Sequence, residues 1–88
     1  MKLKKIQPGP DEISPSEYAV IRFLQDYLDA HPRPPTIRQI AEQVGLSTGG
    51  TADVVRRLEE YGYLVRRRWG SHRMARSIRL KRRVPVVE

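Results

Sequence analysis

Residues 35–64, PTIRQIAEQVGLSTGGTADVVRRLEEYGYL, decide the fold that this sequence predicts. Up to Val44, apolar residues recur three, one and three positions apart, which is the spacing of one helical face. The pattern resumes with a new phase at Val54, so a second helix must point in another direction. Gly45 stands between the two patterns, where glycine enters the left-handed conformation at little cost. We therefore expect two helices joined by a tight turn.

Smaller features favour a helix-turn-helix over a plain helical hairpin, which would carry no function. Ala41 lies one turn before Gly45, where a larger side chain would hold the second helix away. Leu46 adds an apolar contact after the turn, and Ser47 offers its hydroxyl to the first N–H groups of the next helix. In a helix-turn-helix, the second helix of the pair can enter the major groove of DNA.

The size and composition of the chain limit what it can be. Its 88 residues suffice for one small domain, and the lack of cysteine excludes disulfides and thiolate metal sites and favours a reducing cytoplasm. No apolar run is long enough to span a membrane, and no signal-peptide core follows the basic start. Neither His31 nor His72 lies in a metal-ligand or catalytic motif, so an enzyme is the least expected class, and no cofactor, metal or small-molecule ligand is expected.

The net charge of +7 is placed unevenly. Residues 1–63 hold eight Lys/Arg and nine Asp/Glu, whereas residues 64–88 hold nine Lys/Arg and one Glu. A basic stripe at one end of a small domain indicates a polyanion as partner, and double-stranded DNA is the first candidate. A solubilising surface and an anionic membrane are the alternatives, and the membrane is less favoured because the basic segment lacks an amphipathic helical stripe.

The remainder of the chain supplies a scaffold helix and a basic hairpin. The scaffold helix is predicted over residues 13–30, starting at a capping box in Ser14-Pro15-Ser16-Glu17, and a proline-rich connector ends it. Strands over residues 64–69 and 76–80, with a loop over 70–75, form the hairpin, or wing. The fold class is mainly α (α+β), a winged helix-turn-helix of three helices and a two-stranded β wing. The expected parts are a flexible N-terminal arm at 1–12, the DNA-binding domain at 13–80 and a basic C-terminal tail at 81–88.

The start of the third helix is the part expected to face base edges. Two adjacent glycines weaken a helix by about 1 kcal/mol each, so either the backbone approaches the DNA very closely or this turn orders only on binding. Asp53 either accepts a hydrogen bond from a cytosine amino group or stabilises the helix start through the helix dipole. The residues expected to read bases are Ser47, Thr48, Gly49, Gly50, Ala52 and Asp53.

Arginines on either side of this helix are expected to hold the DNA backbone. Arg38 lies in the first turn of the second helix, where contact with a phosphate is geometrically easy. Wing arginines would meet the backbone or enter the adjacent minor groove. The expected backbone contacts are Arg38, Arg56, Arg57, Arg66, Arg68, Arg73, Arg76 and Arg79.

Three segments resemble the N-terminal winged-helix domain of LexA-type repressors: ISPSEYAVIRFLQDYLDAHPRPPTIRQIAEQVGL (13–46), RRLEEYGYL (56–64) and SIRL (77–80). The resemblance implies a repressor, as in the SOS response, that binds operator half-sites as part of a dimer. It places base-reading positions at Ser47, Gly49, Gly50, Ala52 and Asp53, where the side chains differ from the usual ones, so the standard operator is not expected. The family's self-cleaving C-terminal domain has no counterpart here, which implies no peptidase, no built-in release switch, and at most a weak homodimer or a dimer formed on DNA.

The sequence therefore predicts a sequence-specific transcriptional regulator that binds double-stranded DNA. The alternative is a winged-helix interaction module whose wing binds an acidic partner protein.

Overall fold

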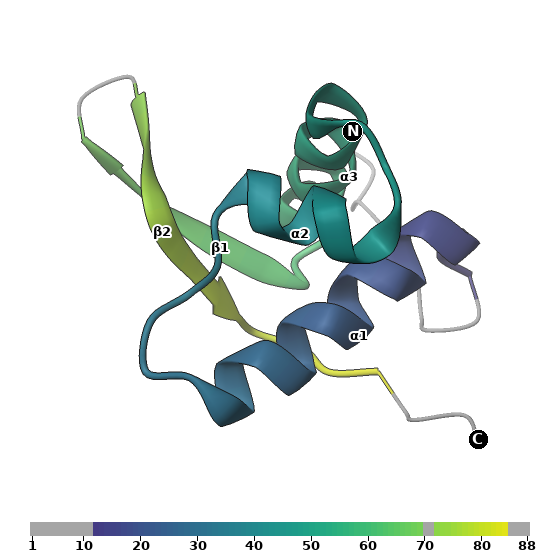
Figure 1. Cartoon of the computed structure of the whole chain (residues 1–88), viewed down its shortest axis with the longest axis horizontal. Helices are drawn as coiled ribbons and strands as arrows, with labels where there is room; N and C mark the ends of the chain where they lie inside the picture. The colour runs from purple at the N-terminus through teal and green to yellow at the C-terminus, as the bar shows by residue number, and fades with distance from the viewer. Residues whose placement is uncertain (1–11, 70–71, 85–88) are drawn as a thin grey trace, which may run out of the picture.

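The computed structural model describes residues 12–69 and 72–84. Three helices pack together and a two-stranded antiparallel sheet projects from them as a hairpin (Figure 1). In chain order the elements are α1 (Pro15–Ala30), α2 (Ile37–Val44), α3 (Thr48–Glu60), β1 (Leu64–Trp69) and β2 (His72–Leu80). The predicted winged helix-turn-helix is confirmed. The expected N-terminal arm falls, up to residue 11, outside the described residues.

The first two helices begin with capping boxes, and the one at Ser14 is confirmed as predicted. The Ser14 hydroxyl accepts a hydrogen bond from the Glu17 N–H at 3.2 Å, and the Glu17 carboxylate accepts one from the Ser14 N–H at 2.8 Å. Thr36 and Gln39 make the same reciprocal pair at 3.1 and 2.8 Å. Each box satisfies N–H groups that the first helical turn leaves without a partner, so these boundaries are set by local sequence.

The turn between α2 and α3 also has the predicted form. Gly45 is left-handed, with φ at 76°, and its N–H donates to the Ala41 carbonyl at 2.9 Å. Ala41 is buried, as a close crossing of the two helices requires. Ser47 caps α3 by accepting a hydrogen bond from the Gly50 N–H at 2.9 Å.

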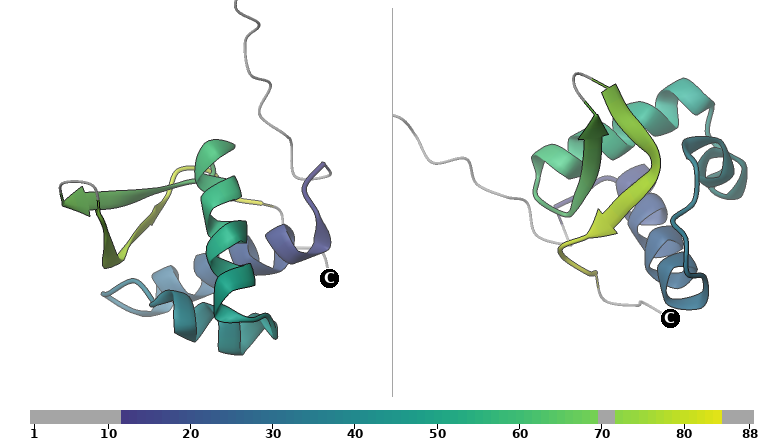
Figure 2. Two further views of the ribbon diagram at one scale, coloured as in Figure 1. Left: turned by 90° about the horizontal axis from the view of Figure 1, so that it is seen from above. Right: turned by 90° about the vertical axis from the view of Figure 1, so that its left-hand side faces the viewer.

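One face of each helix and the inner face of the sheet form a single core. On the sheet, Ile78 is buried while Arg79 is exposed, the alternation of a strand with one face on the core. The core continues from the helices to the base of the hairpin, and the far end of the hairpin extends beyond it (Figure 2). The fully buried apolar side chains of this core include those of Val20, Ile21, Leu24, Ile40, Val55, Leu58, Tyr63 and Leu64.

The second strand begins at His72 rather than at Arg76, so the loop expected over residues 70–75 was wrong for residues 72–75. His72 pairs with Trp69 and Arg73 with Arg68, beyond a register shift between Arg66 and Arg68 at which the extra residues lie on β2. The apolar alternation covers only the end of β2 that packs on the core, because a strand segment away from the core needs no apolar face. Sequence periodicity therefore could not indicate the outer part.

The segment after β2, expected as the start of a basic tail, packs against α1 in its described part. Val84 is buried, and its carbonyl accepts a hydrogen bond from the Gln25 side-chain amide at 3.2 Å while its N–H donates to the Gln25 side-chain oxygen. The Arg82 guanidinium lies 4.3 Å from the centre of the Tyr63 ring. The packed domain therefore extends from the helices to Val84, past the boundary expected at residue 80.

Candidate nucleic-acid interface

The N-terminal half of α3 presents a row of small side chains to solvent. Its opposite face is buried at Thr51, Val54 and Val55, which fixes the orientation of the helix. Five of the six residues predicted to read bases are exposed: Ser47, Thr48, Gly49, Ala52 and Asp53. Gly50 is half-buried. The start of the helix is thus accessible and carries only short side chains, and the major groove of DNA is wide enough to admit an α-helix.

The packing of the protein itself gives no reason for glycine at position 49. A Cβ built on Gly49 would have no neighbour within 4 Å, and neither Gly49 nor Gly50 has a positive φ. At Gly50, a Cβ would meet the capping Ser47 hydroxyl at 3.0 Å, so that glycine has a local role. Glycine in a helix costs about 1 kcal/mol relative to alanine. Gly49 therefore weakens α3, and no contact within the folded chain requires a glycine there.

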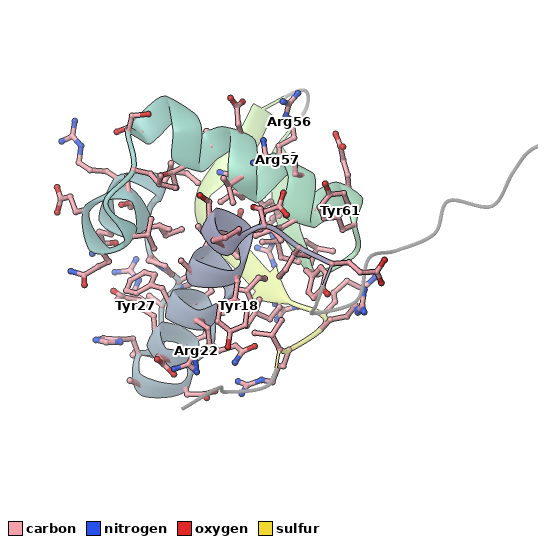
Figure 3. The ribbon with its side chains drawn as sticks, turned by 90° about the vertical axis from the view of Figure 1, so that its right-hand side faces the viewer. Tyr18, Arg22, Tyr27, Arg56, Arg57 and Tyr61 are labelled. Carbon is pink, nitrogen blue, oxygen red and sulfur yellow. The ribbon has the colours of Figure 1, made fainter. Side chains whose placement is uncertain are left out.

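Asp53 and Arg56 form an exposed pair one turn apart on the same helix. The Arg56 Nη2 lies 3.5 Å from the Asp53 Oδ1, a distance at the limit of a hydrogen bond. The pair brings a carboxylate and a guanidinium to one surface of α3, where both are exposed to solvent. Figure 3 shows Arg56 on the outer side of α3 and Arg57 on the side nearer α1.

Arg57 has a carboxylate partner within the protein. Its Nε donates to the Glu17 Oε2 at 2.8 Å, and the Glu17 side chain is only 7% exposed. Burial raises the pKa of Glu17, but hydrogen bonds from the Ser14 N–H and from Arg57 outweigh burial and hold that pKa below its ordinary value. Sequence analysis placed Arg57 against DNA and missed this bridge. Glu17 was visible only as a capping residue, and nothing in the sequence links it to a position 40 residues away.

The predicted wing contacts lie at two levels of the hairpin. Arg66 is half-buried at its base, opposite Ile78, and Arg79 is exposed opposite Val65. Arg68, Arg73 and Arg76 belong to the outer part of the strands, and their side chains lie outside the described residues. The far end of the hairpin and α3 lie on one side of the molecule, with α1 and the C-terminal segment on the other (Figure 1).

The other basic residues divide between these two sides. Arg38 is exposed on α2, next to α3 in the helix-turn-helix. Arg83 pairs with Asp29 of α1, and the Arg83 guanidinium lowers the pKa of that carboxyl. The basic charge of the last 25 residues is therefore not one continuous stripe, because Arg82 lies over the Tyr63 ring and Arg83 is paired with Asp29 of α1.

Two further properties of the described segments concern alternative functions. Their helices include none that is both long and apolar enough to cross a bilayer. Across the same segments, no group of three His, Cys, Asp or Glu side chains is arranged to hold a metal ion.

The sequence is similar to those of known DNA-binding domains. The LexA DNA binding domain family matches residues 11–81. The LexA repressor of Pelotomaculum thermopropionicum is 37% identical over 57 residues, which are 64% of this chain and 28% of that protein. The LexA repressor of Magnetococcus marinus is 31% identical over 90 residues, 99% of this chain and 37% of that protein. The LexA repressor of Carboxydothermus hydrogenoformans is 42% identical over 55 residues, 61% of this chain and 27% of that protein. The chain thus spans well under half the length of these relatives.

Proposed function

The chain belongs to the LexA DNA-binding domain family, and from this premise we propose that it is a transcriptional repressor that binds specific sequences of double-stranded DNA. In this proposal α3 enters the major groove and reads bases with Ser47, Thr48, Gly49, Gly50, Ala52 and Asp53. Arg38, Arg56 and the wing arginines hold the flanking backbone. Arg57 contributes to that contact only through whatever part of its guanidinium the Glu17 carboxylate leaves available.

The observation that carries the proposal is the exposure of the first half of α3 next to the helix-turn-helix turn. Exposed residues there, Thr48 to Asp53 apart from the half-buried Gly50 and the buried Thr51, carry no bulky side chain. A helix with such a surface can lie close to base edges, where a short carboxylate such as Asp53 reaches a cytosine amino group. The relatives named above are LexA repressors, which supports repression as the biological outcome.

The test is selection of bound duplexes from a random DNA pool. The wild-type chain should enrich one motif, and Asp53→Ala and Thr48→Val should each change the preferred base at one position, since a good base contact discriminates by about 1–3 kcal/mol. Glu60→Ala, exposed in the last turn of the same helix, is the control and should leave the motif unchanged. If neither Asp53→Ala nor Thr48→Val alters the motif, the wing-centred interaction module gains support instead.

The same selection reports on assembly. We propose that two copies bind one operator, as a weak homodimer or as a dimer formed on the DNA, in which case the motif should be an inverted repeat. A single, unrepeated motif would indicate one copy per site. The chain is proposed to act in the cytoplasm, without a cofactor and without an enzymatic reaction of its own.

A further inference from the structure

An open groove of about 770 Å³ lies between the connector, residues 31–36, and the base of the wing. Its lining includes four arginines, Arg66, Arg67, Arg79 and Arg83, and no Asp or Glu. Arg67 and Arg83 belong to no predicted DNA contact. The lining also includes apolar side chains, among them that of Val65, which is 39% exposed. The groove thus combines positive charge with an apolar surface.

One wall of the groove is the outer edge of β2. The sheet has two strands in the parts of the chain that the structure describes, and β2 lies between β1 and the connector (Figure 2). The Lys81 N–H donates to the Tyr63 carbonyl at 2.8 Å. By the alternation of an antiparallel ladder, the backbone N–H and C=O groups of Leu80 and Ile78 therefore point away from β1, toward the groove.

The connector does not cover this edge with a strand. It holds Pro32, Pro34 and Pro35, which have no N–H to donate to a ladder. Within the described segments, no backbone hydrogen bond joins the connector to Ile78 or Leu80. The edge is short, since it runs only along the part of β2 next to the core, so it can accept a strand of a few residues.

We propose that this groove binds an extended acidic peptide segment of a partner protein, which adds to the edge of β2 as a short strand. Main-chain hydrogen bonds to Ile78 and Leu80 would give the segment its direction. Its carboxylates would meet Arg67 and Arg79, since Arg83 is already paired with Asp29, and its apolar side chains would cover Val65.

Charge complementarity selects this occupant over a second copy of the chain, whose net charge of +7 would set like charges against the arginines. Duplex DNA offers neither a backbone that pairs with a strand edge nor a large apolar surface. In addition, α2 lies between the connector and α3, so the groove is separate from the exposed face of α3 (Figure 1). Arg66 and Arg79 are also predicted contacts of the DNA backbone, but pairing of a peptide with the edge of β2 does not rest on the DNA-binding function.

A suitable probe is a fluorescent peptide of about eight residues in which Asp and Glu alternate with Val and Ile. Titration of the full chain with this peptide should shift the backbone amide resonances of Ile78, Arg79 and Leu80. A second peptide, with the same side chains but with alternate backbone nitrogens methylated, cannot form the ladder. It should bind about tenfold more weakly, the equivalent of about 1.4 kcal/mol.

A matched pair of variants tests the site on the protein. Arg67→Glu should lower the affinity for the probe about tenfold. Arg33→Glu makes the same change of charge on the exposed connector, outside the groove lining, and should lower the affinity by less than about threefold. Thermal unfolding and the amide spectrum of each variant show whether its fold is retained.

Three results would overturn the proposal. They are equal affinity of the methylated peptide, equal losses for the two variants, and self-association of the chain through the same amides. The last result would make the groove an interface between two copies of the chain.

Discussion

Thr51 places a hydroxyl in a position of α3 that packs against the core. The residue is fully buried, and among the described residues its Oγ1 has no hydrogen-bond partner. A buried hydroxyl that loses water without gaining a partner costs about 1–3 kcal/mol. The helix-turn-helix therefore carries a local source of instability beside its exposed face.

Replacement of Thr51 by Val, which has nearly the same shape, should raise the free energy of unfolding by about 1 kcal/mol. Urea denaturation at neutral pH measures this change. Thr48→Val, at an exposed position of the same helix, is the control and should change stability by less than about 0.5 kcal/mol. A loss of stability in Thr51→Val would show that the hydroxyl does have a partner.

A substitution at Gly49 should affect the stability of the fold and the affinity for DNA in opposite directions. Gly49→Ala introduces a methyl group into open space, so α3 should gain up to about 1 kcal/mol. If the backbone of the first turn lies against base edges, the same methyl group should weaken binding to the selected duplex about tenfold. Fluorescence anisotropy measures the affinity for the duplex, and urea denaturation measures the free energy of unfolding.

The opposite result has a clear meaning. Tighter binding by Gly49→Ala would show that the glycine pair leaves the turn to be ordered by DNA, because a pre-formed helix lowers the ordering cost of binding. Glu60→Ala serves as the control, since it alters the same helix at its exposed far end and should leave the affinity nearly unchanged.

At the scale of the elements, a single ion pair ties the helix that would read DNA to the scaffold helix. Glu17 belongs to the first turn of α1 and Arg57 to the last turn of α3. The carboxylate also receives the Ser14 N–H, so the start of α1 and the end of α3 are held by one group. This contact fixes the angle between the two helices in addition to the apolar core.

The ion pair predicts a dependence of stability on pH. Because the pKa of Glu17 in the folded chain is below its ordinary value of 4.5, its contribution is fully present above that value and is lost as the pH falls through the folded pKa. Glu17→Gln should therefore flatten the fall in unfolding free energy between about pH 5 and about pH 3. Asp26→Asn, which removes a more exposed pair with Arg22, should leave most of that fall in place. Urea denaturation across this pH range makes the comparison.

At the scale of the whole molecule, the placement of charge determines how the domain would meet DNA. Arg56 lies on α3 itself, Arg38 and the outer wing lie on the elements that flank α3, and Arg83 is paired with Asp29 of α1. If about five arginines neutralise phosphates, the logarithm of the binding constant should fall with the logarithm of salt concentration with a slope of about −4 to −5.

Variants can assign that slope to particular residues. Arg38→Ala should reduce its magnitude by about 0.9, the value for one phosphate contact. Arg83→Ala removes an arginine from the α1 side and should leave the slope within error. Affinity measured at several salt concentrations gives all three slopes, and an affinity that does not depend on salt would contradict the DNA-binding proposal.

The sequence by itself determined the elements and the turn, because the signals for these features act over a few residues. Capping boxes at Ser14 and Thr36, and the left-handed Gly45, depend on hydrogen bonds and backbone sterics within one helical turn. The exposed face of α3 followed in the same way from the apolar positions of its buried face.

Only the tertiary structure decided which distant residues meet. Arg57 pairs with Glu17, and Val84 packs on Gln25, so each of these contacts joins segments that are far apart in the sequence. The outer part of β2 pairs with β1 although it has no apolar pattern. These contacts depend on the angles between packed elements, which no local pattern of residues encodes. For that reason the sequence showed how many basic residues the end of the chain holds, while the fold decided which of them pair within the protein and which stay exposed.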